Sequence, residues 1–93
     1  MQDFISTNIE KKLALKLKEA YDSRADNLSN SIKITEQVFQ EFTALQSEAG
    51  IASSKNLLGL FYLIRGEFEK AEEFSQSALR YFESVNDLKG IAD

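Results

Sequence analysis

One short stretch of sequence recurs after 40 residues, and this recurrence constrains the fold more than any other feature of the chain. Gly50-Ile51-Ala52 returns as Gly90-Ile91-Ala92. At the same offset, apolar residues fall mostly on apolar residues: Leu17 on Leu57, Leu28 on Phe68, Ile34 on Phe74, Val38 on Ala78, and Phe42 on Phe82. Matches at one fixed offset indicate a repeat protein. We therefore predict one unit over 7–46, a second over 47–86, and the start of a third over 87–93.

Each unit is predicted to contain two helices. In the first unit, Thr7 and Glu10 form a capping-box pattern, which places one helix over about 8–24. A second apolar stripe, with Ile34, Val38 and Phe42 on one face, places the next helix over about 28–45. Short connections make successive helices antiparallel.

The second unit has clearer boundaries. Ser47 suits the N-cap of a third helix, and Gly66 suits its left-handed C-cap. A fourth helix is predicted over about 68–84, and Asp87, the equivalent of Ser47, is expected to cap a truncated fifth. The predicted fold class is all-α, a single domain built from antiparallel helix-turn-helix repeats.

Composition excludes several classes of function. The chain has 93 residues, without Cys or His, and a formal net charge of -4. Zinc and iron–sulfur sites, disulfides and Ser–His nucleophiles are excluded, and a nucleic-acid surface would need clustered positive charge. A carboxylate metal bundle needs His as well as Glu projecting inward. We therefore expect no enzymatic activity, no cofactor, no metal and no nucleic-acid partner.

The sequence also gives an expectation about location. Its first ten residues lack the basic region of a secretory signal. The longest nearly unbroken apolar run, 57–64, is far shorter than the roughly 20 residues that cross a bilayer. We expect a cytoplasmic protein without a membrane partner.

The second unit closely resembles a tetratricopeptide repeat (TPR). The resemblance extends over 52–83, and the residues that carry it are Leu58, Gly59, Tyr62, Gly66, Phe68, Ala71, Ala78 and Leu79. Three of them, Gly59, Ala71 and Ala78, are the small residues that the TPR pattern has at these spacings. Two helices cross closely only where one lacks a bulky side chain, and Gly59, Ala71 and Ala78 meet that need. The resemblance implies a right-handed helical solenoid.

The first unit departs from the TPR pattern. Glu19, Ser31 and Val38 stand where the second unit has its three small residues. This difference indicates either looser packing or a slip of one residue in the first helix. Glu83 replaces the usual proline, and the period is 40 rather than the commoner 34 or so. Such long units resemble those in regulatory regions of bacterial signalling proteins.

The TPR resemblance also implies a peptide-binding groove lined by the inner faces of the first helix of each unit. The matching positions of the second unit are Ser53, Asn56, Leu60, Leu63 and Ile64. The offset of 40 assigns Leu13, Lys16, Ala20, Ser23 and Arg24 to the first. Alternatively, Leu60 and Leu63 pack on a neighbouring helix or a second copy of the chain.

Two charged clusters are predicted to be solvated. The basic cluster consists of Lys11, Lys12, Lys16 and Lys18, and lacks interleaved aromatic residues. The acidic cluster of Glu69, Glu72 and Glu73 suits the positive end of a helix dipole.

Together these features predict a protein–protein interaction module that forms the regulatory part of a larger signalling protein. The alternative is a structural segment that self-associates. In that case the cut-short third unit would leave Phe74, Tyr81 and Val85 uncovered on the last helix, and the chain would form a homodimer through its C-terminal end.

Overall fold

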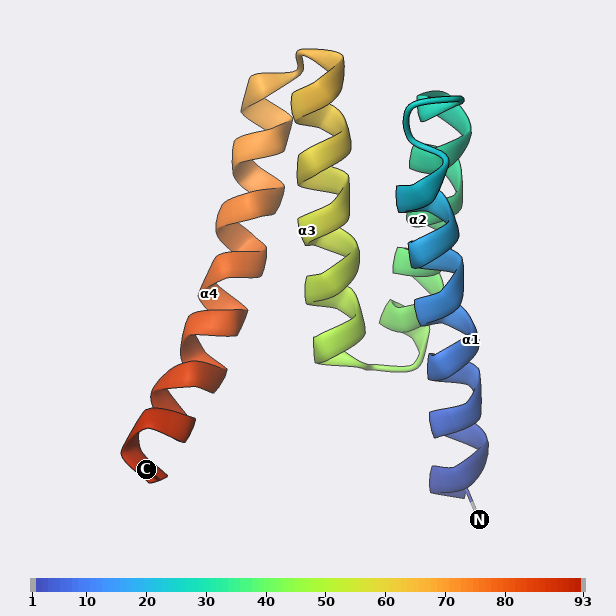
Figure 1. The fold of residues 1–93 in the computed structure, drawn as a ribbon. Coiled ribbons are helices and arrows are strands. Elements are labelled where there is room, and N and C mark those ends of the chain that lie inside the picture. Colours follow the sequence, from blue (N-terminus) through green and yellow to red (C-terminus); the bar gives the residue numbers. More distant parts are fainter. Residues whose placement is uncertain (1, 93) are drawn as a thin grey trace.

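The chain folds into four antiparallel α-helices joined by short turns (Figure 1). The computed structural model describes the backbone of residues 2–92 and the side-chain environments of residues 8–85. Over that backbone range the helices are α1 (Gln2–Asp22), α2 (Leu28–Ala44), α3 (Glu48–Arg65) and α4 (Phe68–Ala92), and no strand is present. The predicted all-α fold class is confirmed.

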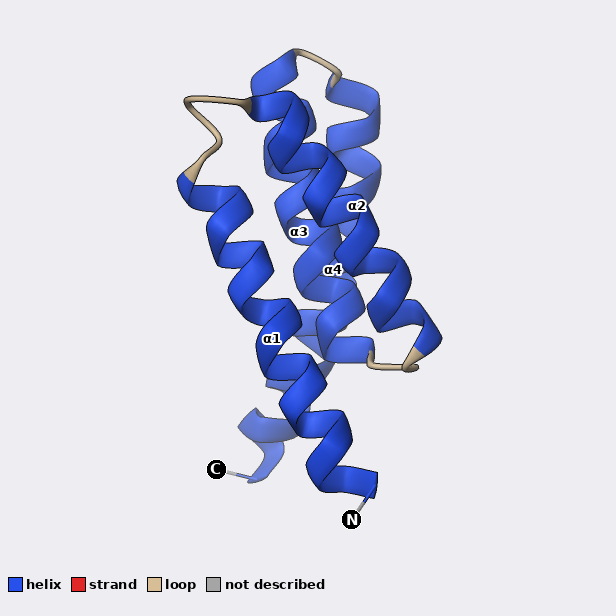
Figure 2. Ribbon diagram, turned by 90° about the vertical axis from the view of Figure 1, so that its right-hand side faces the viewer, coloured by secondary structure: helices blue, strands red, loops and turns tan. Residues whose placement is uncertain are grey.

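The four helices form two hairpins that lie side by side. Figure 2 shows α1 and α2 in front of α3 and α4, and α3 contacts α2, α4 and, more lightly, α1. In Figure 1, α4 diverges from α3 with increasing distance from the turn that joins them. No helix in the described part of the chain is long and apolar enough to cross a membrane.

Local sequence signals account for the boundaries of the two middle helices. The Asn27 side chain accepts a hydrogen bond from the Asn30 amide at 3.1 Å, which caps α2. Ser47 accepts one from the Gly50 amide at 3.3 Å and caps α3, as predicted. Gly66 ends α3 at a φ of 87°, the left-handed conformation predicted for it.

Two predicted helix boundaries are wrong. Thr7 lies inside α1, which begins at Gln2, and Asp87 lies inside α4, which continues to Ala92. Both residues suit an N-cap, but a cap acts only where the preceding chain leaves the helical conformation. Neither 2–6 nor 83–87 contains Gly or Pro to interrupt a helix. The expected fifth helix is therefore absent as a separate element.

The register of the first hairpin distinguishes the two explanations for its departure from the second unit, which were looser packing and a slip of one residue. Leu13 and Ala20 are buried in α1, and the equivalent buried positions of α3 are Ser54 and Phe61, 41 residues later. In the second helix of each hairpin, Ser31 and Val38 of α2 match the buried Ala71 and Ala78 of α4 at an offset of 40. The stretch from Ala20 to Ser31 is therefore one residue longer than the equivalent stretch from Phe61 to Ala71, and this burial pattern supports a slip rather than loose packing.

A buried serine replaces the expected small residue in the first hairpin. Ser31 occupies the place of Ala71 and is fully buried. Its hydroxyl lies 3.1 Å from that of Ser23 and 3.2 Å from the Asn27 carbonyl oxygen. These contacts satisfy a polar group that burial would otherwise destabilise.

Two glycines bring the helices close together. A Cβ atom on Gly59 would lie 3.2 Å from the Ala71 carbonyl oxygen and 2.5 Å from the Ser75 hydroxyl, so α3 approaches α4 closely there. A Cβ atom on Gly50 would overlap the buried ring of Phe42, which joins α2 to α3. These close approaches fix the position of α3, the helix that carries most of the predicted groove.

Candidate functional site

An open groove of about 620 Å³ runs between α3 and α4, near the turn that joins them. We call it the α3–α4 groove. It is lined by residues of α3 and α4 and by one residue of α1: Tyr21, Asn56, Leu57, Gly59, Leu60, Leu63, Phe68, Ala71, Glu72 and Ser75. The groove thus lies on the second hairpin and includes Gly59 and Ala71, where α3 and α4 approach closely.

Large apolar side chains remain exposed around this groove. Phe68 is 66% exposed and Leu63 is 52% exposed. The Tyr21 ring, 41% exposed, borders the groove from α1. Clustered apolar exposure of this kind is typical of a surface that binds another protein.

The groove contains few polar groups. Asn56 lies on the α3 wall and Ser75 on the α4 wall. Glu72 is the single charged residue among those that line the groove, and its Oε1 accepts a hydrogen bond from the Gln76 amide at 3.1 Å. A partner would therefore meet an apolar surface with one carboxylate.

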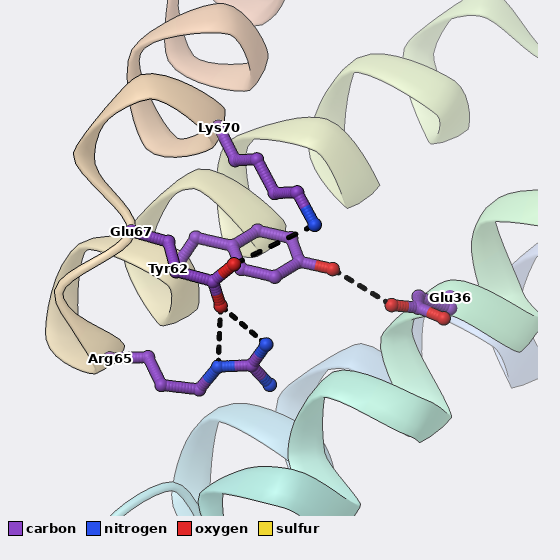
Figure 3. Close-up of polar contacts among 5 residues, drawn as sticks. All are labelled: Glu36, Tyr62, Arg65, Glu67 and Lys70. Atoms are coloured by element: carbon purple, nitrogen blue, oxygen red, sulfur yellow. Dashed lines mark hydrogen bonds and ion pairs between the residues drawn. The ribbon is translucent and has the colours of Figure 1, made fainter.

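The turn between α3 and α4 is held by charged side chains on either side of Glu67. The Arg65 guanidinium donates a hydrogen bond from Nε to the Glu67 carboxylate at 2.6 Å. Lys70 lies 3.6 Å from the other carboxylate oxygen (Figure 3). With Gly66 in its left-handed conformation, these contacts hold the turn beside the groove in place.

Tyr62 connects α3 to both neighbouring helices. Its hydroxyl donates a hydrogen bond to the Glu36 carboxylate of α2 at 2.9 Å (Figure 3). Its ring stacks on Phe74 of α4, with centroids 5.7 Å apart. Arg65 and Lys70 lie 5.3 and 5.4 Å from the ring centroid. Tyr62 therefore positions α3 rather than contacting a partner in the groove.

The surroundings of Tyr62 favour its neutral form. Burial raises the pKa of the phenol, and the hydrogen bond to Glu36 raises it further. The negative charge of Glu36 acts in the same direction, whereas Arg65 lowers the pKa. The neutral phenol is the form that donates the hydrogen bond between the hairpins.

The predicted binding residues of the second unit lie on one face of α3. Asn56, Leu60 and Leu63 line the groove. Ser53 is exposed one turn closer to the start of α3, and Ile64 is exposed beside Leu63.

The predicted binding residues of the first unit do not join this face. Ala20 and Leu13 are buried in the core, so neither can contact a partner. Lys16 lies elsewhere, in a shallow depression shared with α2. Ser23 bonds within the first hairpin, and Arg24 stacks on Tyr21 with its guanidinium 3.8 Å from the ring centroid. The offset of 40 had assigned these residues one position out of register.

Sequence reasoning missed the α4 wall of the groove and Tyr21. In the sequence, Phe68 belongs to the repeat pattern and Glu72 to an acidic cluster that is predicted to be solvated, so neither was expected in the groove. A signal for Tyr21 was available, because Tyr21 and Arg24 have the same spacing as Tyr62 and Arg65, 41 residues later. In both pairs the arginine lies over the tyrosine ring.

Comparisons with known proteins gave no match for this chain among protein-family models, curated proteins or solved structures. The functional argument therefore rests on the geometry and chemistry of the groove.

Proposed function

We propose that this chain is a protein–protein interaction module that binds its partner at the α3–α4 groove. The observation that carries the proposal is the exposure of Leu63 and Phe68 on opposite walls of an apolar groove. The walls are held by the close approach at Gly59 and by the turn at Gly66. A rigid groove loses little conformational entropy when it binds.

The proposal includes a TPR-like arrangement of the two hairpins. Burial of Ala71 and Ala78, and the close approach of α4 at Gly59, support it. The same resemblance supports the proposal of a cytoplasmic signalling role within a larger protein.

A binding role fits the groove better than catalysis does. Glu72 is the one carboxylate among the lining residues, and the sequence has no His or Cys to act with it. General acid–base or nucleophilic catalysis usually needs a second group within hydrogen-bond reach.

A site-specific cross-linking experiment tests the proposed function. A photoreactive amino acid is placed at Leu63 in the groove or at the exposed Ser29 on α2. We expect a discrete cross-linked partner from position 63 only. Adding Asn56→Ala and Leu60→Ser should abolish that product without changing the helical circular dichroism. Equal products from both positions, or a product that survives the double change, would contradict the proposal.

Self-association is the second candidate, and one observation favours it. Leu79 is 54% exposed and Phe82 is 37% exposed on α4, so apolar surface continues beyond the groove. This surface differs from the predicted one, because Phe74, Tyr81 and Val85 are each partly buried. Dimerisation through α4 would give a sedimentation coefficient and a melting temperature that rise with concentration.

A further inference from the structure

The exposed face of α4 carries a regular stripe with one charged member. Phe68, Glu72, Ser75, Leu79 and Phe82 follow a spacing of four and three residues, which places them on one side of the helix. We call these five residues the α4 stripe. Its first three members line the α3–α4 groove opposite Leu60 and Leu63. The stripe and the α3 wall together form a two-helix cradle.

The cradle suits a helix better than an extended peptide. Beyond the first turn of α4, its walls are helices whose backbone groups bond within each helix, so they offer no continuous edge for a strand. An extended peptide would need partners for its own backbone groups, and the groove offers only the side chains of Asn56, Glu72 and Ser75. A helix satisfies its backbone internally and presents apolar side chains at spacings of three and four residues.

Glu72 determines the charge that the occupant must carry. One of its oxygens accepts the hydrogen bond from Gln76, and the carboxylate borders the apolar surface that a partner would cover. Covering a carboxylate without a counter-charge is unfavourable. No Lys or Arg is among the residues that line the groove, and Arg24 and Arg65 have partners of their own, the Tyr21 carbonyl oxygen at 2.7 Å and the Glu67 carboxylate.

Two further carboxylates on α4 add to the negative charge at Glu72. Glu69 and Glu73 are exposed on the same part of α4, and the whole chain has a net charge of -4. A basic partner is therefore attracted before contact and paired after it.

A symmetric pairing of two α4 stripes does not supply the missing charge. If two α4 stripes packed together, each copy would bring another Glu72, and none of the five stripe residues is basic. Arg80 lies on the other side of α4, in a depression with Lys55 and Tyr81.

We propose, on the basis of the proposed function above, that the α3–α4 groove binds an amphipathic helix of a partner protein whose apolar anchors flank a Lys or Arg that pairs with Glu72.

Three synthetic helical peptides test this inference. Each has about 15 residues and the same Leu and Phe anchors at three- and four-residue spacing, and they differ at one central position, which is Lys, norleucine or Glu. Binding to the intact chain is measured by fluorescence anisotropy at low and high salt. We expect the Lys peptide to bind about fivefold more tightly than the norleucine peptide, and the Glu peptide to bind most weakly. The advantage of Lys should shrink with salt.

Matched variants assign the effect to one residue. Glu72→Gln should remove the preference for Lys, whereas Glu73→Gln, one residue away and outside the groove lining, should retain it. Leu63→Ser should weaken all three peptides. If the three peptides bind equally but Leu63→Ser still weakens them, groove binding stands and the basic-helix inference fails. If no peptide binds, or if the chain instead dimerises through the α4 stripe, the inference also fails.

Discussion

The Tyr62 hydroxyl of α3 and the Glu36 carboxylate of α2 form a hydrogen bond of 2.9 Å between the two hairpins. The Tyr62 ring also stacks on Phe74 of α4, so one side chain connects three helices. The groove depends on the position of α3, and this side chain helps to set that position.

Removing the Tyr62 hydroxyl should destabilise the fold without changing its core. Tyr62→Phe keeps the stacked ring but leaves Glu36 without its donor, and we expect the free energy of unfolding to fall by about 1 kcal/mol. Urea unfolding followed by circular dichroism measures the change. Tyr21→Phe, on an exposed ring, is the matched control and should have little effect. Equal stability of the parent and Tyr62→Phe would show that the hydrogen bond contributes nothing.

The same hydroxyl should make stability depend on alkaline pH. The pKa of Tyr62 is raised above its ordinary value of 10.0, so the folded chain keeps the proton after the unfolded chain has released it. The resulting stabilisation is complete below the unfolded pKa of 10.0 and is lost as the pH rises through the higher, folded pKa. The stability difference between the parent and Tyr62→Phe should therefore be constant at neutral pH and shrink above about pH 10. A difference that grew with pH would contradict the raised pKa.

Gly50→Ala should be destabilising although Ala is the better helix former. The added Cβ would overlap the ring of Phe42, which is only 3% exposed and has little room to move. We expect a loss of about 1–3 kcal/mol, the usual cost of overpacking. A double-mutant cycle with Phe42→Leu tests the cause, because the smaller side chain should reduce the cost of Gly50→Ala. Additive effects of the two changes would place the strain elsewhere.

Helix ends were predictable where the signal is local. Ser47 and Gly66 act through their own backbone and side-chain geometry, and both predictions are confirmed. Thr7 has an equally suitable side chain, but its role as a cap depends on residues before it that continue the helix. The sequence pattern describes the capping residue without showing whether the chain has left the helix.

The groove was only half predictable for a different reason. Asn56, Leu60 and Leu63 follow from the free face of one helix, which helical periodicity defines. Phe68 and Leu79 are apolar at helical spacing, and that pattern is the same for a buried residue and for one whose partner lies in another molecule. The prediction that Ala20 belongs to the binding face is wrong because a fixed offset takes no account of the extra residue between the buried positions of α1 and α2.

Replacing Glu72 should convert the α4 stripe into a dimer interface. In the parent chain, Glu72 interrupts the apolar side chains of Phe68 and Leu79, and we expect a monomer because stacking two stripes would cover two carboxylates while the stripe residues themselves include no cation. Glu72→Leu joins these side chains into one apolar face, and an uncovered face of this kind tends to self-associate. Sedimentation velocity over a hundredfold range of about 1 to 100 µM should show association of Glu72→Leu only, and its melting temperature should rise with concentration. Glu73→Leu adds the same apolar area and removes the same charge outside the groove lining, so it should remain monomeric. A parent chain that already dimerises would favour the self-association candidate, and equal association of both variants would show that added apolar area, rather than the position of Glu72, controls assembly.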